Sequence, residues 1–271
     1  MSAPLLAVDG DSFAHRAYHG LPKSVNRNAV VGFTNMIVRL WEQEEPRAVV
    51  VGWDTLEVPT YRHEAFPAYQ SGREFDASLL EQLAMLPQLC TGLGFVVGKA
   101  PGYEADDFLA AAVAHEEGRG GTVLVASGDR DAFQLASERT TIIQPIRGVS
   151  ELARIGPEEV RERYGVEPAQ VPDFIALRGD PSDKLPGAKG VGPKTAADLL
   201  RQYESLEAML ADGRFSAQAD ELRLYRRIAA MDAEAPLADV PDAEPDWNGG
   251  AEVTRGWGLN NVADRLAARA Q

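Results

Sequence analysis

Short apolar runs alternate with longer segments of helical periodicity through the first part of the chain. The apolar runs are rich in β-branched residues and bounded by turn residues, and they cover residues 4–8, 47–53, 95–98, 122–127 and 140–145. Between them, apolar side chains recur at helical spacing over residues 30–44, 75–94 and 105–118. Because strands that alternate with helices form βαβ units, the pattern predicts an α/β fold with a parallel sheet flanked by helices.

The pattern changes near residue 155, where the strand signals stop. The later segments are typical of short helices joined by loops rich in glycine and proline, and they cover residues 156–165, 167–179, 192–203, 205–210 and 218–232. A chain of 271 residues suits one large domain or two small ones. We therefore expect an α/β region over residues 1–155 and a helical region over residues 156–271.

Composition points to an ordinary globular protein of a reducing compartment. Apolar residues make up 45% of the chain and charged residues 25%. No apolar run approaches the ~20 residues of a membrane-spanning helix, and the N-terminal stretch reaches Asp9 too early for a secretory signal. Cys90 is the only cysteine, which excludes a disulfide framework. We expect a cytoplasmic protein with no membrane association.

The formal net charge of −14 argues against a protein that binds nucleic acid through a basic surface alone. That argument does not hold if many of the acids lie in one metal site, because bound cations would neutralise their negative charge there. The positions of the acids along the chain decide between the two readings.

Acidic residues follow four of the five predicted strands. Asp9 and Asp54 each end a strand, Asp129 and Asp131 follow a third, and the cluster 104–107 begins the helix after a fourth. The carboxyl ends of parallel strands meet at one edge of the sheet, where ligands bind. One such acid is usually a helix cap, but four groups together would repel one another unless a cation lay among them. Carboxylates are the ligands that Mg²⁺ and Mn²⁺ prefer, so the sequence predicts a divalent-metal site.

The cluster in "GYEADDFLAA", residues 102–111, has two readings. At ~5 Å and an effective dielectric constant of ~20, each pair of carboxylates costs roughly 3 kcal/mol. Acids in the first turn of a helix are also stabilised by its dipole and its free N–H groups, without any metal. Glu104 and Asp107 are three residues apart and share a face, whereas Asp106 points elsewhere unless the helix begins between them.

A second acidic pair and a run of glycines occur in the helical region. Asp180 and Asp183 flank a Pro-Ser turn, and three glycines, the last being Gly192, precede Pro193. The spacing resembles an ATP-binding loop, but Pro193 stands where that loop needs lysine, and no strand precedes it. A helix–hairpin–helix over residues 173–203 that binds a DNA phosphate fits better. Its expected DNA-binding residues are Lys184, Gly187, Lys189, Gly190, Val191, Gly192, Lys194 and Thr195.

Five motifs, in order, resemble those of one known family. The motifs are "VDGDS", "YRHEAFPAYQSGR", "PGYEADDFLA", "SGDRDAFQL" and "GDPSDKLPGAKGVGPKTA". The chain resembles the 5′-nuclease (flap endonuclease) domain found at the N-terminus of bacterial DNA polymerase I and as free-standing enzymes. No polymerase region follows here, so we expect a stand-alone enzyme or an excised domain.

The resemblance implies a PIN-like nuclease core whose acids hold two or more Mg²⁺ or Mn²⁺ ions. One ion would lie near Asp9, Asp54 and the segment 104–107, and another near the remaining aspartates. The implied metal ligands are Asp9, Asp54, Glu104, Asp106, Asp107, Asp129, Asp131, Asp180 and Asp183. The resemblance also implies a helical arch over residues 60–95, through which a 5′ end passes, and K⁺ bound by carbonyls of the hairpin.

Arg16 and Arg73 match basic positions that the family places near the scissile phosphate. The departure from the family that matters most is Gln70, which stands where an active-site lysine is usual, and a smaller one is Lys184, which stands where asparagine is common. Gln70 is therefore a candidate catalytic residue without the expected charge.

The expected function is that of a structure-specific 5′ nuclease in replication and repair. It would hydrolyse phosphodiester bonds at 5′ flaps and at 5′ ends of duplex DNA by a two-metal-ion mechanism. We expect a monomer at the bacterial nucleoid whose partners are DNA with a flap, a nick or a 5′ end, and RNA primer ends. The alternative is a DNA-junction-binding protein that keeps the fold with little or no catalysis, and only the change at Gln70 supports it.

Overall fold

A six-stranded sheet forms the centre of the molecule. The computed structural model describes residues 3–72 and 74–270. The strands are β1 (Leu5–Asp9), β2 (Ala48–Gly52), β3 (Val96–Gly98), β4 (Val123–Ala126), β5 (Thr140–Pro145) and β6 (Leu152–Ile155). They lie in the order β3-β2-β1-β4-β5-β6, with every pair parallel except β5 and β6. The carboxyl ends of the parallel strands therefore meet at one edge.

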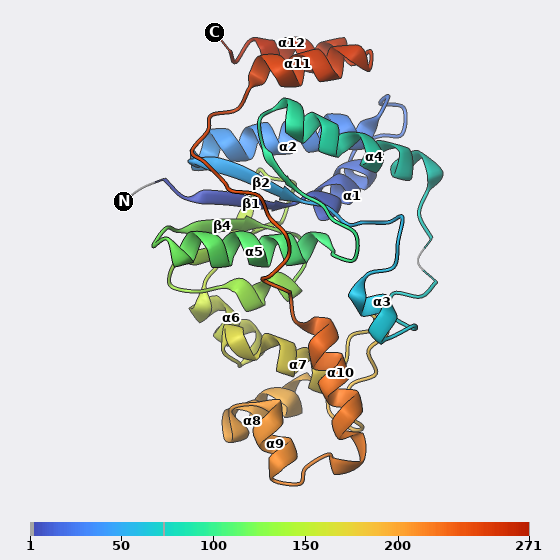
Figure 1. The fold of residues 1–271 in the computed structure, drawn as a ribbon, viewed down its shortest axis with the longest axis vertical. Helices are drawn as coiled ribbons and strands as arrows, with labels where there is room; N and C mark the ends of the chain where they lie inside the picture. Colours follow the sequence, from blue (N-terminus) through green and yellow to red (C-terminus); the bar gives the residue numbers. More distant parts are fainter. Residues whose placement is uncertain (1–2, 73, 271) are drawn as a thin grey trace.

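Helices cover both faces of this sheet (Figure 1). The helices that precede β6 in the chain are α1 (Gly10–Gly20), α2 (Asn28–Glu44), α3 (Tyr61–Ala65), α4 (Ala77–Gly92) and α5 (Ala105–Gly118). Helices α1, α2 and α4 lie over one face and α5 over the other. A short 3₁₀ helix, Asp131–Leu135, follows β4.

A helical region follows the sheet and packs on the α5 side. It contains α6 (Pro157–Tyr164), α7 (Val171–Arg178), α8 (Pro193–Tyr203), α9 (Leu206–Ala211) and α10 (Ala219–Ala229), with 3₁₀ turns at Pro168–Gln170 and Ser216–Gln218. The chain then returns across the molecule to α11 (Trp247–Gly256) and α12 (Asn260–Ala267) (Figure 1). These two helices pack on the outer side of α2 and α4.

Successive side chains of each strand point to opposite faces of the sheet, so the strands contribute to two hydrophobic clusters, one on each face. Leu6 and Val8 of β1 join the cluster under α1, α2, α4, α11 and α12, whereas Leu5 and Ala7 join the cluster that includes α5 and helices α6 to α10. The second cluster runs without a break from β1 to Leu222 of α10. The α/β and helical regions therefore share this second cluster.

The predicted fold class is confirmed, and the five predicted strands and the helices named from the pattern are present. Strand β6 and helices α1, α3, α11 and α12 were not predicted. Part of the stretch 60–95 in which an arch is expected lies in the core, because α4 is packed there by Leu79, Leu83 and Leu86. Any arch is limited to the segment between β2 and α4, which includes α3.

No helix within the described residues is both long enough and apolar enough to cross a membrane.

Candidate functional site

Acidic side chains line a cleft at the carboxyl edge of the sheet. The cleft has a volume of about 1030 Å³, and residues of the α/β region and of the helical region both border it. Its carboxylates are those of Asp9, Asp11, Asp54, Glu104, Asp106, Asp129, Asp131, Asp180 and Asp183. Eight of the nine acids expected as metal ligands are thus brought together, and Asp107 is the exception.

The ends of β1 and β2 fix the first carboxylates. Asp9 is the N-cap of α1: its Oδ1 accepts a hydrogen bond from Ser12 N–H at 2.9 Å, and its Oδ2 accepts one from Ser127 Oγ at 2.7 Å. Asp54 Oδ1 accepts a hydrogen bond from the backbone N–H of Ala105 at 2.8 Å. The acid at the end of β2 is thereby tied to the first turn of α5.

The first turn of α5 separates the three clustered acids. Glu104 is the N-cap and Asp107 the third residue of a capping box, with Asp107 Oδ2 accepting a hydrogen bond from Glu104 N–H at 3.1 Å. Glu104 and Asp106 line the cleft. Asp107 is fully buried behind it and is paired with Arg62 at 2.8 and 2.9 Å. The helix begins at Ala105, which is the condition under which Asp106 turns toward the other acids.

Two further pairs complete the acidic lining. Asp129 Oδ1 accepts a hydrogen bond from Asp131 N–H at 3.0 Å in the turn after β4. In the helical region, Asp180 and Leu185 exchange backbone hydrogen bonds of 2.8 Å, which closes a tight loop carrying Asp183. Both pairs therefore project from short turns at the border between the two regions.

Burial and mutual repulsion disfavour the ionised form of several of these acids. Burial, together with the nearby charges of Asp54 and Asp129, raises the pKa of Asp9 to about 7, although the hydrogen bonds that it accepts from Ser12 and Ser127 lower it. Burial and neighbouring carboxylates hold the pKa values of three more acids well above the ordinary value: Asp11, Asp106 and Asp131. A cation in the cleft would relieve both effects.

The donor set fits a hard divalent cation. All nine acids offer carboxylate oxygens, which suit Mg²⁺ and Mn²⁺, whereas zinc favours nitrogen and sulfur ligands. Among the residues that the structure describes, no three His, Cys, Asp or Glu side chains are close enough together to enclose a metal ion as they stand. The carboxylates are neighbours across an open cleft, and ligation would require their side chains to converge.

Gln70 faces the cleft and makes a hydrogen-bonded bridge across it. Its Nε2 donates to Asp183 Oδ1 at 3.1 Å and to Tyr69 Oη at 2.8 Å. Tyr69 Oη in turn donates to Glu104 Oε2 at 2.9 Å. Gln70 thus connects the acid at the N-cap of α5 with an acid of the helical region.

Of the two arginines expected near the scissile phosphate, Arg16 lines the cleft from α1. Arg73 lies outside the described residues, and its place stays a prediction.

Sequence reasoning missed Asp11 and Arg178. Asp11 Oδ2 accepts a hydrogen bond from Asp54 N–H at 2.7 Å, and Arg178 Nη2 lies 3.4 Å from Asp180 Oδ2. Asp11 stands two residues after Asp9 in the quoted "VDGDS" motif, a spacing that could have marked it. Arg178 carried no local signal beyond ending an apolar helix.

The glycine hairpin before α8 is built from two kinds of glycine. Gly187 has φ +76°, and a Cβ there would lie 2.4 Å from the backbone nitrogen of Gly179, so it is required for the hairpin to close. A Cβ at Gly190 or Gly192 would meet no atom within 4 Å. The expected lysines of this region, Lys184, Lys189 and Lys194, are exposed together with Thr195, and Val191 is partly buried.

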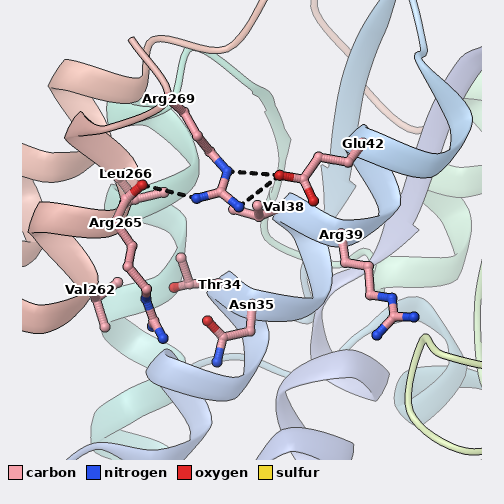
Figure 2. Close-up of a pocket in the computed structure, with 9 residues that line it drawn as sticks. All are labelled: Thr34, Asn35, Val38, Arg39, Glu42, Val262, Arg265, Leu266 and Arg269. Carbon is pink, nitrogen blue, oxygen red and sulfur yellow. Dashed lines mark hydrogen bonds and ion pairs between the residues drawn. The ribbon is translucent and has the colours of Figure 1, made fainter. Parts of the chain in front are cut away.

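A separate pocket between α2 and α12 has different chemistry. Arg269 donates two hydrogen bonds to Glu42 Oε1 at 3.0 and 2.7 Å, and Arg39 and Arg265 also line this space of about 340 Å³ (Figure 2). It shares no lining residue with the acidic cleft. We place no part of the acidic site there.

Comparison with known proteins gives the family. Residues 4–165 match the family described as "5'-3' exonuclease, N-terminal resolvase-like domain", and residues 166–246 match "5'-3' exonuclease, C-terminal SAM fold". DNA polymerase I of Mycobacterium bovis is 39% identical over 255 residues, which are 88% of this chain and 28% of that protein. DNA polymerase I of Bacillus caldotenax is 40% identical over 240 residues, 85% of this chain and 27% of that protein. The chain thus spans less than a third of these relatives.

Among solved structures, the fold matches a flap endonuclease of bacteriophage T5, described as a pseudo-enzyme-product complex with DNA and metal ions. The TM-score is 0.70 at 17% identity, and the match covers 98% of each chain. The molecule therefore has the T5 exonuclease fold, a mostly parallel sheet followed by a helical SAM-type region with a helix–hairpin–helix. The chain belongs to the 5′-3′ exonuclease family and is homologous to the 5′-nuclease region of DNA polymerase I.

Proposed function

We propose that this chain is a structure-specific 5′ nuclease that hydrolyses phosphodiester bonds at 5′ flaps and 5′ ends of duplex DNA. The observation that carries the proposal is the single cleft in which eight of the expected carboxylates meet. The T5 relative, whose structure holds DNA and metal ions, and the polymerase I relatives support the same class of reaction.

The acids divide into two groups by the elements that carry them. Asp9, Asp54, Glu104 and Asp106 come from the ends of β1 and β2 and the start of α5, and we assign them to one Mg²⁺ or Mn²⁺ ion. We assign four aspartates at the border of the helical region to a second ion: Asp129, Asp131, Asp180 and Asp183. Asp107 is left out of both groups because its oxygens are already engaged by protein donors.

Divalent ions bound by these two groups of acids would supply the activation of a water molecule and the stabilisation of the negative charge that develops at the phosphate. The chain itself holds the acids in place. Hydrogen bonds from Ser12, Ser127 and Ala105 orient Asp9 and Asp54, and the loop 180–185 presents Asp183. We assign Arg16 and Arg73 to the scissile phosphate, which an arginine can bind through two N–H groups.

We assign the glycine hairpin before α8 to binding the DNA duplex. Exposed N–H groups at the N-terminus of α8 and the positive end of its dipole favour a phosphate, and the open space beside Gly190 and Gly192 leaves room for one. Lys189 and Lys194 add positive charge there. K⁺ at the hairpin carbonyls and RNA primer ends as a substrate stay predictions.

Cleavage of a labelled flap tests the proposal. A duplex carrying a 5′-labelled single-stranded flap is expected to release the label with Mg²⁺ or Mn²⁺ and to stay intact with EDTA. Tight binding of the flap without cleavage in either metal would favour the alternative, a junction-binding protein that keeps the fold. Release that continues in EDTA would overturn the assignment of the carboxylates.

A further inference from the structure

Arg62 of α3 is a buried cation at the base of the segment between β2 and α4. Its residue surface is 3% exposed. Nη1 and Nη2 donate to the two oxygens of Asp107 at 2.9 and 2.8 Å, and Nη1 also lies 3.3 Å from Glu104 Oε2. Nε donates to the carbonyl of Ile228 at 2.9 Å, and Nη2 to that of Ala230 at 3.2 Å.

These contacts leave Arg62 unsuited to binding DNA. All three guanidinium nitrogens have protein acceptors, and a phosphate could reach them only if the ion pair with Asp107 opened. Leaving the fully buried Asp107 without its partner would be strongly unfavourable. A role through other residues therefore fits Arg62 better than a direct contact with substrate.

The residues that Arg62 contacts belong to two elements. Asp107 and Glu104 open α5, while Ile228 and Ala230 lie at the C-terminal end of α10. Figure 1 shows α3 beside α10, at a distance from the layer of α4. Arg62 thus fastens the base of the segment to the helix that carries cleft acids and to the helical region.

Both carboxylate oxygens of Glu104 are held by side chains of this base. Its Oε1 accepts a hydrogen bond from Thr60 Oγ1 at 2.7 Å, and its Oε2 accepts one from Tyr69 Oη at 2.9 Å beside Arg62. Every side chain in these contacts comes from residues 60–69. The position of Glu104 in the cleft is therefore set by the base of the segment.

We propose that Arg62 is a positioning residue: it holds Glu104 in the orientation needed for a divalent cation, and it fastens residues 60–69, the base of the segment between β2 and α4, to α5 and α10. The inference rests on the proposed function, since it assigns Glu104 to a metal. It also gives Asp107 a role, because Asp107 holds the guanidinium that faces Glu104.

A matched pair of substitutions separates positioning from stability. Arg47 is a partly buried arginine that also pairs with an acid of α5, since it binds Glu116 near the other end of that helix and the carbonyl of Val240. Arg62→Lys and Arg47→Lys each keep the charge and remove the planar fork. Both are expected to lower the thermal midpoint of unfolding.

Metal affinity distinguishes the two variants. Direct titration with Mn²⁺, followed through the EPR signal of the free ion, is expected to show binding weakened about 10-fold or more in Arg62→Lys, as for other residues that orient metal ligands. Arg47→Lys is expected to bind Mn²⁺ as the unaltered chain does. Equal Mn²⁺ affinity in both variants would overturn the inference.

Two further outcomes are informative. If Arg62→Lys does not fold, Asp107→Asn serves instead, because it keeps the shape of the side chain and frees Arg62 to move onto Glu104. Weakened Mn²⁺ binding then supports the inference and unchanged binding overturns it. Flap cleavage by the unaltered chain is measured separately, so failure of the proposed function is recognised there and not confused with failure of the role of Arg62.

Discussion

At the scale of single residues, the cleft brings together acids whose charges oppose one another. Burial and neighbouring carboxylates raise the pKa of Asp9 to about 7 and hold that of Asp106 well above the ordinary value. Asp107, one position further on, is surrounded by donors and has Arg62 as its counter-ion. The first turn of α5 thus contains Asp107, whose charge is neutralised by Arg62, and Asp106, which faces the other acids of the cleft.

Gln70 stands where the resemblance led us to expect an active-site lysine. Its amide contacts Asp183 without adding charge. A lysine in its place would keep that contact and add a positive charge near the proposed position of the scissile phosphate. Gln70→Lys is expected to raise the single-turnover rate of flap cleavage, by up to ~10²-fold for a well-placed donor, while flap affinity stays nearly unchanged.

Gln70→Ala is the control for this prediction. It removes the amide without adding charge, so its rate is expected to stay much closer to that of the unaltered chain. Single-turnover rates measured at saturating metal decide the matter. If lysine and alanine both give the original rate, Gln70 has no part in transition-state stabilisation.

At the scale of elements, the hairpin before α8 combines tight packing with open space. Gly179 and Gly187 both have positive φ, and their backbones approach each other so closely that a Cβ at either would clash. Gly192 has φ −97° and ψ 178°, which any residue can adopt, and open space beside it. Its conformation and packing therefore do not require glycine, although close approach of a phosphate would.

Gly192→Ala tests that interpretation. The thermal midpoint should stay the same, while affinity for duplex or flap DNA should fall for all base sequences alike, because backbone contacts carry no sequence information. Gly256→Ala, at the exposed end of α11 where a Cβ also meets no atom within 4 Å, is the matched control. Full DNA affinity in Gly192→Ala would place the duplex elsewhere.

The elements that could be predicted have a pattern in their own sequence, whereas those that were missed depend on tertiary contacts. The central strands are continuous apolar runs because both faces of the sheet are covered. Helix α11 contains Gly249 and Gly250, which weaken any helical pattern, yet a Cβ at Gly249 would lie 2.3 Å from the carbonyl oxygen of Gly92. Its glycines serve a close contact with the end of α4, and no local pattern could show that contact.

At the scale of the whole molecule, the site depends on both regions. One hydrophobic cluster joins β1 and β4 to α7, α8 and α10. Asp129 and Asp131 approach the cleft from the sheet, and Asp180 and Asp183 from the helical region. The cleft forms only when the two regions are packed together.

The site was predictable to the extent that its residues end strands or flank glycine turns. Asp9, Asp54 and Asp131 carry that signal locally. The burial of Asp107 was not predictable, because its partner Arg62 lies 45 residues earlier in the chain and meets it only through tertiary packing. The helical tendency of residues 75–94 likewise did not show that α4 belongs to the core.

The central claim is that the carboxylates of the cleft serve cleavage through a divalent metal and are not required for binding the duplex. Asp131→Asn removes one charge and keeps the shape of the side chain. Flap affinity is measured in Ca²⁺ and single-turnover cleavage in Mg²⁺ on the same preparation. Asp264→Asn, an exposed change in α12 that is remote in the fold, is the control.

We expect Asp131→Asn to bind the flap as tightly as the unaltered chain and to lose about 10²-fold or more in single-turnover rate, as when a group that stabilises the transition state is removed. Asp264→Asn should match the unaltered chain in both measurements. Cleavage by Asp131→Asn at the rate of the control would contradict the metal role of the cleft acids and with it the proposed mechanism.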